Sequence, residues 1–131
     1  MAKQRINGDQ LGNTGGAWQT WTPTITNSAG SITATPAFAK YIQIGKTVHF
    51  KITLSISAVS AGGSLRITPP VAAASDQSYI GSGREDASTG SMTEVMFKST
   101  VSYMSLFFYN NTGSTATAGY THALSGTYEA A

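Results

Sequence analysis

The sequence predicts an all-β protein, an antiparallel β-sandwich, on three observations. Serine and threonine supply roughly a quarter of the 131 residues, whereas charged residues supply only 11% and glycine occupies 14 positions. β-branched and hydroxyl side chains fit a pleated sheet better than a helix. Apolar residues also alternate with polar ones in short runs, and glycine or proline separates the runs. We therefore expect many short strands joined by tight turns.

The clearest strand is predicted over residues 46–57, in the segment KTVHFKITLSIS. Its apolar residues stand at every second position and are Val48, Phe50, Ile52, Leu54 and Ile56. A period of two gives a strand one buried and one wet face, so we expect Phe50 in the core. A shorter strand over 38–45 ends at Gly45-Lys46, which predicts a β-hairpin over 38–57.

The rest of the chain supplies further short strands and no helix longer than a turn. The expected strands cover residues 65–70, 78–86, 93–101, 103–110 and 122–130. Two prolines end the strand over 65–70, because proline cannot donate to a β-ladder. Eight to ten strands in one unit predict a single β-sandwich domain over 17–131. Residues 1–16 hold turn dipeptides and few apolar residues, so we expect a flexible arm or connector there.

Composition limits the classes of function. The net charge of +2 forms no basic stripe, which argues against nucleic-acid binding. No apolar run approaches the ~20 residues that cross a bilayer, and no hydrophobic stretch follows the basic residues at the N-terminus. We therefore expect neither membrane insertion nor a secretory signal peptide. The chain has no cysteine, as is typical of a protein assembled in a reducing cytoplasm.

Catalytic chemistry has no recognisable motif in this chain, and we expect neither an enzyme nor a cofactor. Glu85 and Asp86 are adjacent, so on a strand they point to opposite faces and make a poor glycosidase pair. With Arg84 they are expected to form salt bridges or a turn. His49 is expected on the wet face of its strand. His122 is expected at a strand edge; the alternative, for a chain that forms a trimer, places it near the threefold axis, where three copies would bind a metal or an anion.

Two polar segments are candidates for carbohydrate contact, because sugars present apolar C–H faces ringed by hydroxyls. The first lies in 107–120, and its candidate residues are Tyr109, Asn110, Asn111, Thr112 and Tyr120. The alternative interpretation of this segment is a hairpin loop whose asparagines only form turns. The second lies in 74–79, and its candidate residues are Asp76, Gln77 and Tyr79.

The tryptophans in AWQTWTPT are interpreted as structural anchors rather than a sugar platform. Trp18 and Trp21 are three positions apart, and residues three apart on a strand face opposite sides. We expect Trp21 in the core and Trp18 at the linker or at a subunit boundary. Phe50, and Tyr128 on the last predicted strand, are the other two expected anchors.

Five motifs follow one another in a fixed order: WQTWTPT (18–24), KYIQIGKTVHFKITLSI (40–56), ITPPV (67–71), GSGREDASTG (81–90) and SGTYEA (125–130). In this order they resemble the C-terminal domains of tail fibres and related tail proteins from tailed bacteriophages. RINGDQLG resembles the connector that precedes those domains. The resemblance implies a homotrimer of jelly-roll-like β-sandwiches, intertwined or side by side, at the distal end of a fibre that recognises the bacterial surface.

On this resemblance we expect an adhesin whose partners are itself, other tail proteins and a bacterial surface glycan or outer-membrane receptor. Such a protein would be made in the host cytoplasm, released by lysis and carried on the virion, where it acts outside the cell. The alternative is a purely structural trimerising cap, or a virion or baseplate attachment domain without a ligand. A further alternative is an accessory domain of a polysaccharide depolymerase, an enzyme class that normally needs a longer chain with converging carboxylates.

Overall fold

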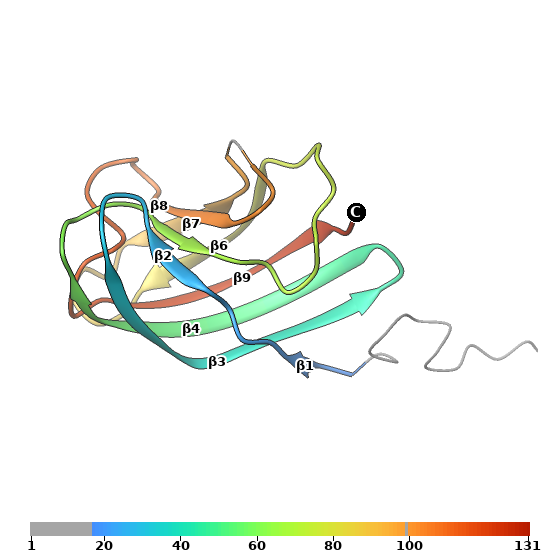
Figure 1. The fold of residues 1–131 in the computed structure, drawn as a ribbon, viewed down its shortest axis with the longest axis horizontal. Helices are drawn as coiled ribbons and strands as arrows, with labels where there is room; N and C mark the ends of the chain where they lie inside the picture. The colour runs from blue at the N-terminus through green and yellow to red at the C-terminus, as the bar shows by residue number, and fades with distance from the viewer. Residues whose placement is uncertain (1–16, 99) are drawn as a thin grey trace, which may run out of the picture.

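The protein, described by a computed structural model over residues 17–98 and 100–131, is a curled antiparallel sheet of nine strands (Figure 1). These residues contain no helix, so the expected all-β, antiparallel class is confirmed. No helix among them is therefore long and apolar enough to span a membrane. The arm expected at residues 1–16 lies outside the described residues.

The strands are β1 (Gln19–Thr20), β2 (Ile25–Asn27), β3 (Ile32–Ile44), β4 (Thr47–Val59), β5 (Leu65–Ile67), β6 (Tyr79–Glu85), β7 (Met92–Met96), β8 (Met104–Phe108) and β9 (Thr121–Glu129). Along the sheet they lie in the order β1-β3-β4-β9-β6-β7-β8-β5-β2, and every neighbouring pair is antiparallel. In Figure 1 the sheet curls through β9 and β6, so that β7 and β8 lie across from β3 and β4.

The hairpin expected over 38–57 is present but longer, because β3 begins at Ile32 and pairs with β4 as far as Val59. Pro36 lies within β3 at a shift of the pairing register, where a residue that cannot donate to the ladder is tolerated. The strands expected over 65–70 and 93–101 end early, at Ile67 and Met96.

The core lies inside the curl, and β4 contributes five of its side chains. All five apolar residues of the alternation predicted for this strand, Phe50 among them, are at most 2% exposed. Tyr128 on the neighbouring β9 is 3% exposed, and its ring packs edge-on against Phe97 with 5.6 Å between centroids. The Tyr128 hydroxyl donates to the Val71 carbonyl at 2.7 Å and accepts from the Val71 amide at 3.0 Å. Burial raises the pKa of Tyr128 to about 12.

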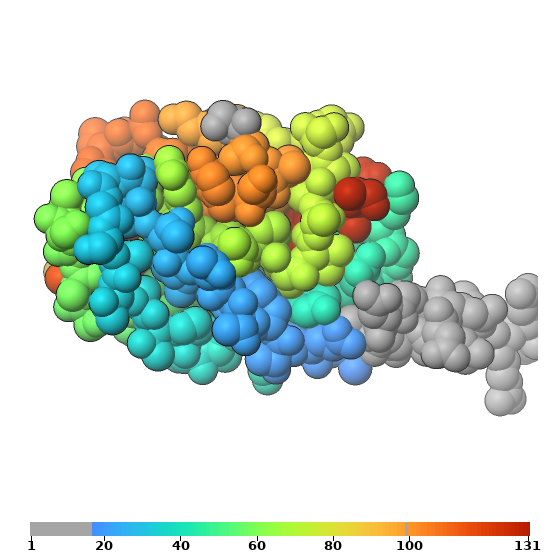
Figure 2. Space-filling model, viewed as in Figure 1, coloured from blue at the N-terminus to red at the C-terminus, as the bar shows by residue number. Residues whose placement is uncertain are grey.

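One stretch of chain, residues 19–27, holds the two ends of the sheet together. Its first part, β1, pairs with β3 at one end of the sheet, and its last part, β2, pairs with β5 at the other. Between them Trp21 N–H donates to the Ala39 carbonyl at 3.1 Å. Thr24 N–H donates to Thr68 Oγ1 at 2.8 Å, and Thr68 N–H returns a bond to the Thr24 carbonyl at 3.0 Å. Figure 2 shows this stretch, in blue, lying across the surface of the molecule.

Trp21 lies at the crossing point and contacts both ends of the sheet. Its indole Nε1 donates to the Thr68 carbonyl at 3.2 Å, just beyond β5. Its ring packs against the core and meets Tyr41 of β3 edge-on, with centroids 6.3 Å apart. Trp18, by contrast, is 47% exposed and holds the Lys51 ammonium 4.4 Å from its ring centroid. The two tryptophans therefore have separate surroundings and form no shared platform.

Replacing Trp21 with alanine is expected to lower the free energy of unfolding by about 3 kcal/mol, because the change removes a large packed ring from the junction of the two sheet ends. Trp18→Ala, the matched control, removes only an exposed cation–π contact and is expected to cost about 0.5–1 kcal/mol. Urea titrations followed by circular dichroism measure both losses. Equal losses in the two variants would contradict the role assigned to Trp21.

Candidate functional site

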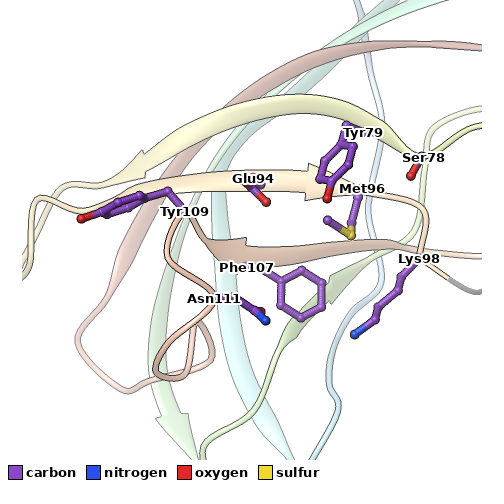
Figure 3. A pocket seen from close by; sticks show the side chains of 8 residues that line it. All are labelled: Ser78, Tyr79, Glu94, Met96, Lys98, Phe107, Tyr109 and Asn111. Carbon is purple, nitrogen blue, oxygen red and sulfur yellow. The ribbon is translucent and has the colours of Figure 1, made fainter.

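A shallow pocket on the outer face of β6, β7 and β8 gathers exposed aromatic side chains, and we call it the aromatic groove (Figure 3). It encloses about 450 Å³ and is lined by Ser78, Tyr79, Glu94, Met96, Lys98, Phe107, Tyr109 and Asn111. Strand geometry explains this set, because β7 buries Thr93 and Val95 and turns the alternate residues outward.

Strand pairing places three aromatic residues in a staggered row along β7, with Tyr79 on its β6 side and Phe107 and Tyr109 on its β8 side. Each lies opposite an outward residue of that strand: the pairs are Tyr109 with Met92, Phe107 with Glu94 and Tyr79 with Met96. Outward positions on a strand recur every ~7 Å, so the row extends over roughly 13 Å. Figure 3 shows the same order, with Tyr109 at one end and Tyr79 at the other. Tyr79 and Tyr109 are 71% and 64% exposed.

Charged and amide groups border these rings. The Lys98 ammonium lies 4.9 Å from the centre of the Phe107 ring, and Glu94 lies across the strand pair from Phe107. Asn111 reaches the groove from the tight turn after β8, where its φ is 53° and its N–H donates to the Phe108 carbonyl at 2.8 Å. Apolar ring faces beside hydrogen-bonding groups can stack and orient a sugar ring.

The groove contains residues from both segments that are predicted to contact carbohydrate. Tyr109 and Asn111 come from the first segment, and Tyr79 comes from the second. Asn110 and Thr112 do not line the groove. Asn110 Oδ1 accepts from the Thr112 N–H at 3.2 Å, as the alternative interpretation of this segment as a turn expects.

Three further sequence candidates do not line the groove. Tyr120 is partly buried, and its ring packs edge-on against Phe108. Gln77 donates through Nε2 to the Glu129 carbonyl at 2.8 Å, which ties its loop to β9. Asp76 is exposed and is not among the lining residues.

The other lining residues are not among the sequence candidates; they are Ser78, Glu94, Met96, Lys98 and Phe107. Glu94, Met96 and Lys98 stand at alternate positions of a predicted strand. This signal assigns the three to one face of the strand. It does not reveal that Tyr79 and Tyr109 share that face.

Glu85 is fully buried, and its carboxylate closes the turn after β6. It accepts backbone N–H groups, at 2.5–3.0 Å, from Thr89, Thr121, Ala87 and Ser88. Burial raises the pKa of Glu85, but these N–H donors outweigh burial and lower the pKa to about 2. Asp86 pairs with Arg84 at 3.5 Å. The turn and salt-bridge roles predicted for this segment are therefore confirmed.

His122 is fully buried on β9, which pairs with β4 on one side and β6 on the other. The expectation of a strand-edge histidine is therefore wrong. Its Nε2–H donates to the Thr115 carbonyl at 2.8 Å, and burial lowers the pKa of the imidazole. A side chain without exposed surface cannot meet its copies on a threefold axis, so the metal or anion site considered there finds no support.

His49 lies on the outer face of β4, with its Nδ1 2.8 Å from Thr127 Oγ1. This position agrees with the expected wet face. Among the residues that the structure describes, no group of three or more histidine, cysteine, aspartate or glutamate side chains is arranged to hold a metal ion.

Comparisons of the chain with protein-family models, with curated proteins and with solved structures find no match. The geometry of the aromatic groove and the motif order in the sequence are therefore the two grounds for a functional proposal.

Stability is expected to fall as the pH drops from 4.5 toward 2, because the folded pKa of Glu85, about 2, lies below its ordinary value of 4.5. The unfolded chain takes up a proton in this window and the folded chain does not, so the free energy of unfolding loses roughly 2–3 kcal/mol. Urea titrations at pH 7, 4.5 and 2.5 measure the loss.

Glu85→Gln is the control, because an amide does not titrate. This variant is expected to be less stable at pH 7 and to show a flatter profile below pH 4.5. His122 also favours unfolding in acid, and it does so somewhat more in the variant, because the Glu85 charge that raises its pKa is gone. Parallel profiles for the wild type and the variant would contradict the role assigned to the carboxylate.

Proposed function

We propose that this protein is a carbohydrate-binding adhesin, the tip domain of a bacteriophage tail fibre, and that the aromatic groove binds a bacterial surface polysaccharide. The observation that carries the binding proposal is the pair Tyr79 and Tyr109, which are 71% and 64% exposed beside Phe107. Exposed apolar surface grouped in one place marks an interaction site. A sugar covers aromatic faces with its C–H groups and bonds to bordering polar groups through its hydroxyls.

The row of aromatic residues favours an extended sugar chain over a single terminal sugar. Each step along β7 covers ~7 Å, which is comparable to the length of one sugar residue in a chain. A shallow groove on a sheet face leaves both ends of a chain free, so an internal stretch of polysaccharide fits. The volume of about 450 Å³ falls within the ~300–1,000 Å³ of small-ligand sites.

Three chains are proposed to assemble as a homotrimer of jelly-roll-like β-sandwiches. One open groove binds a sugar chain weakly, and three grooves on one particle raise the avidity without any new contact. The exposed Trp18 beside Lys51 offers an outer surface on which a second subunit can pack. Light scattering tests the assembly: a mass near three times 13.6 kDa is expected, and the mass of one chain would contradict the trimer.

The assignment to a phage rests on the motif order in the sequence. A phage tail protein is made in the host cytoplasm, leaves by lysis and acts on the virion together with other tail proteins, which agrees with a chain that has no cysteine. Adhesion rather than turnover is the proposed mechanism. Glu85 is engaged by backbone N–H groups, and Glu94 is the one carboxylate among the residues lining the groove. An outer-membrane protein is the alternative receptor.

A purely structural role, as a trimerising cap or an attachment domain without a ligand, is the second candidate. The observation that favours it is another hollow, of about 340 Å³, on the outer face of β4 and β9. Trp18, Lys51 and Thr127 line this hollow, and a neighbouring subunit or tail protein would cover them. The third candidate is an accessory domain of a depolymerase. It would differ from the adhesin and from the structural domain because its parent enzyme would cleave the polysaccharide.

Replacing Tyr79 and Tyr109 together with alanine is expected to abolish polysaccharide binding and to leave the fold intact, because both rings are exposed. Each single change is expected to weaken binding about three- to tenfold, the loss of one stacking contact. Labelled wild-type protein and variants are applied to a panel of bacterial strains and to their purified surface polysaccharides. Melting temperatures check the fold of each variant.

Phe38→Ala is the control, since it removes an exposed aromatic ring from β3 that does not line the groove, and it is expected to bind as the wild type does. Full binding by the double tyrosine variant would show that the site lies elsewhere. If the wild type decorates no strain and binds no polysaccharide, the structural role replaces the adhesin. Release of reducing ends from a bound polysaccharide would contradict the non-catalytic mechanism.

A further inference from the structure

Two cations near one end of the aromatic groove lie over aromatic rings. The Lys98 ammonium is 4.9 Å from the centre of the Phe107 ring, and the Arg66 guanidinium is 4.7 Å from the centre of the Tyr103 ring. Within the described part of the chain, no ion pair includes either cation. An aromatic ring attracts a cation without neutralising its charge, so both side chains can still attract an anion.

Strand register brings these cations to the same part of the outer face. Arg66 on β5 and Met96 on β7 both pair with Ser105 of β8, which lies between them and is 4% exposed. Lys98 follows Met96 by two residues, just beyond the end of β7. Tyr79 also pairs with Met96, from the other side of β7, so Lys98 borders the Tyr79 end of the groove and Arg66 lies two strands away from Met96.

The carboxylate of the groove lies further along β7. Glu94 is two positions before Met96, a step of ~7 Å along the strand. It faces Phe107 in the middle of the aromatic row. Glu94 and the Lys98 ammonium lie on different sides of Phe107 (Figure 3). An anionic ligand group is therefore attracted on the Lys98 side of this ring and repelled on the Glu94 side.

We propose that the polysaccharide bound by the groove is acidic, with ring carboxylates that are separated along the chain by neutral sugars. This inference rests on the adhesin function proposed above. The acidic sugar stacks on Tyr79, and its carboxylate accepts from the Lys98 ammonium while Arg66 adds attraction. A carboxylate attached directly to a sugar ring lies at the edge of that ring, within reach of a cation beside the stacking residue. The next sugar is neutral, and its hydroxyls donate to Glu94.

The test compares three probes: a polysaccharide that alternates glucuronate with N-acetylglucosamine, the same polymer after carboxyl reduction, and polygalacturonate. Wild-type protein is expected to bind the alternating polymer about five- to tenfold more tightly than its reduced form, the effect of one charge-assisted contact. Polygalacturonate is expected to bind more weakly than the alternating polymer, because its consecutive carboxylates meet Glu94. The preference for the acidic polymer is expected to shrink as salt is raised.

Lys98→Gln is expected to remove the preference for the alternating polymer over its reduced form, whatever its effect on the affinity for the reduced form itself. Lys40→Gln is the matched control, because it removes an exposed cation from β3, and it is expected to keep the preference. Calorimetry measures the affinities, and melting temperatures check that both variants fold.

Equal binding of the alternating polymer and its reduced form by the wild type would overturn the acidic ligand, and so would a preference that survives in Lys98→Gln. Either result leaves the adhesin standing, provided that the strain panel shows binding that depends on Tyr79 and Tyr109. Absence of binding to the alternating polymer would also overturn the acidic ligand. The proposed adhesin function is contradicted only if the wild-type protein binds no strain and no surface polysaccharide of the panel.

Discussion

The junction at Trp21 is the constraint on which the rest of the sheet depends. β1 and β2 are two and three residues long, too short to stabilise an edge alone, yet together they bond to both ends of the sheet. The junction covers edges of β3 and β5 that would otherwise present unpaired backbone groups. It also keeps the sheet curled, and the curl encloses the side chains of β4 and β9 in the core. The uncharged segment AWQTWTPT therefore has a structural explanation.

The curl also determines where the residues of the aromatic groove can stand. Because side chains alternate along a strand, β7 buries Val95 on its inner face and presents Glu94 on its outer face. Groups held on paired strands keep their spacing better than groups on loops. The strand β6, which carries Tyr79, also approaches β9 closely. A Cβ atom on either Gly81 or Gly126 would lie 2.2 Å from a carbonyl oxygen of the partner strand, so only glycine fits where the sheet bends.

Much of the fold follows from local patterns, because alternation is a property of neighbouring residues. The strand within 46–57 and the turn at Gly45-Lys46 can be predicted directly from such patterns. The order of strands in the sheet cannot, since β9 pairs with partners that are distant in sequence. For this reason His122 is expected at an edge although it lies in the middle of the sheet. The groove, too, can be predicted only in part. Tyr79 and Tyr109 are recognisable in the sequence as aromatic residues in polar segments, but only their pairing with β7 brings them together.

The central claim is that recognition occurs in the aromatic groove on the outer face of β6, β7 and β8 and not in the loop over residues 114–119. Nuclear magnetic resonance tests this most directly, by following backbone and aromatic chemical shifts while a polysaccharide fragment that binds in the strain panel is added. The account predicts that the largest shift changes fall on Tyr79, Glu94 and Phe107, and that they saturate together. Largest changes in residues 114–119, or around Trp18, would contradict it.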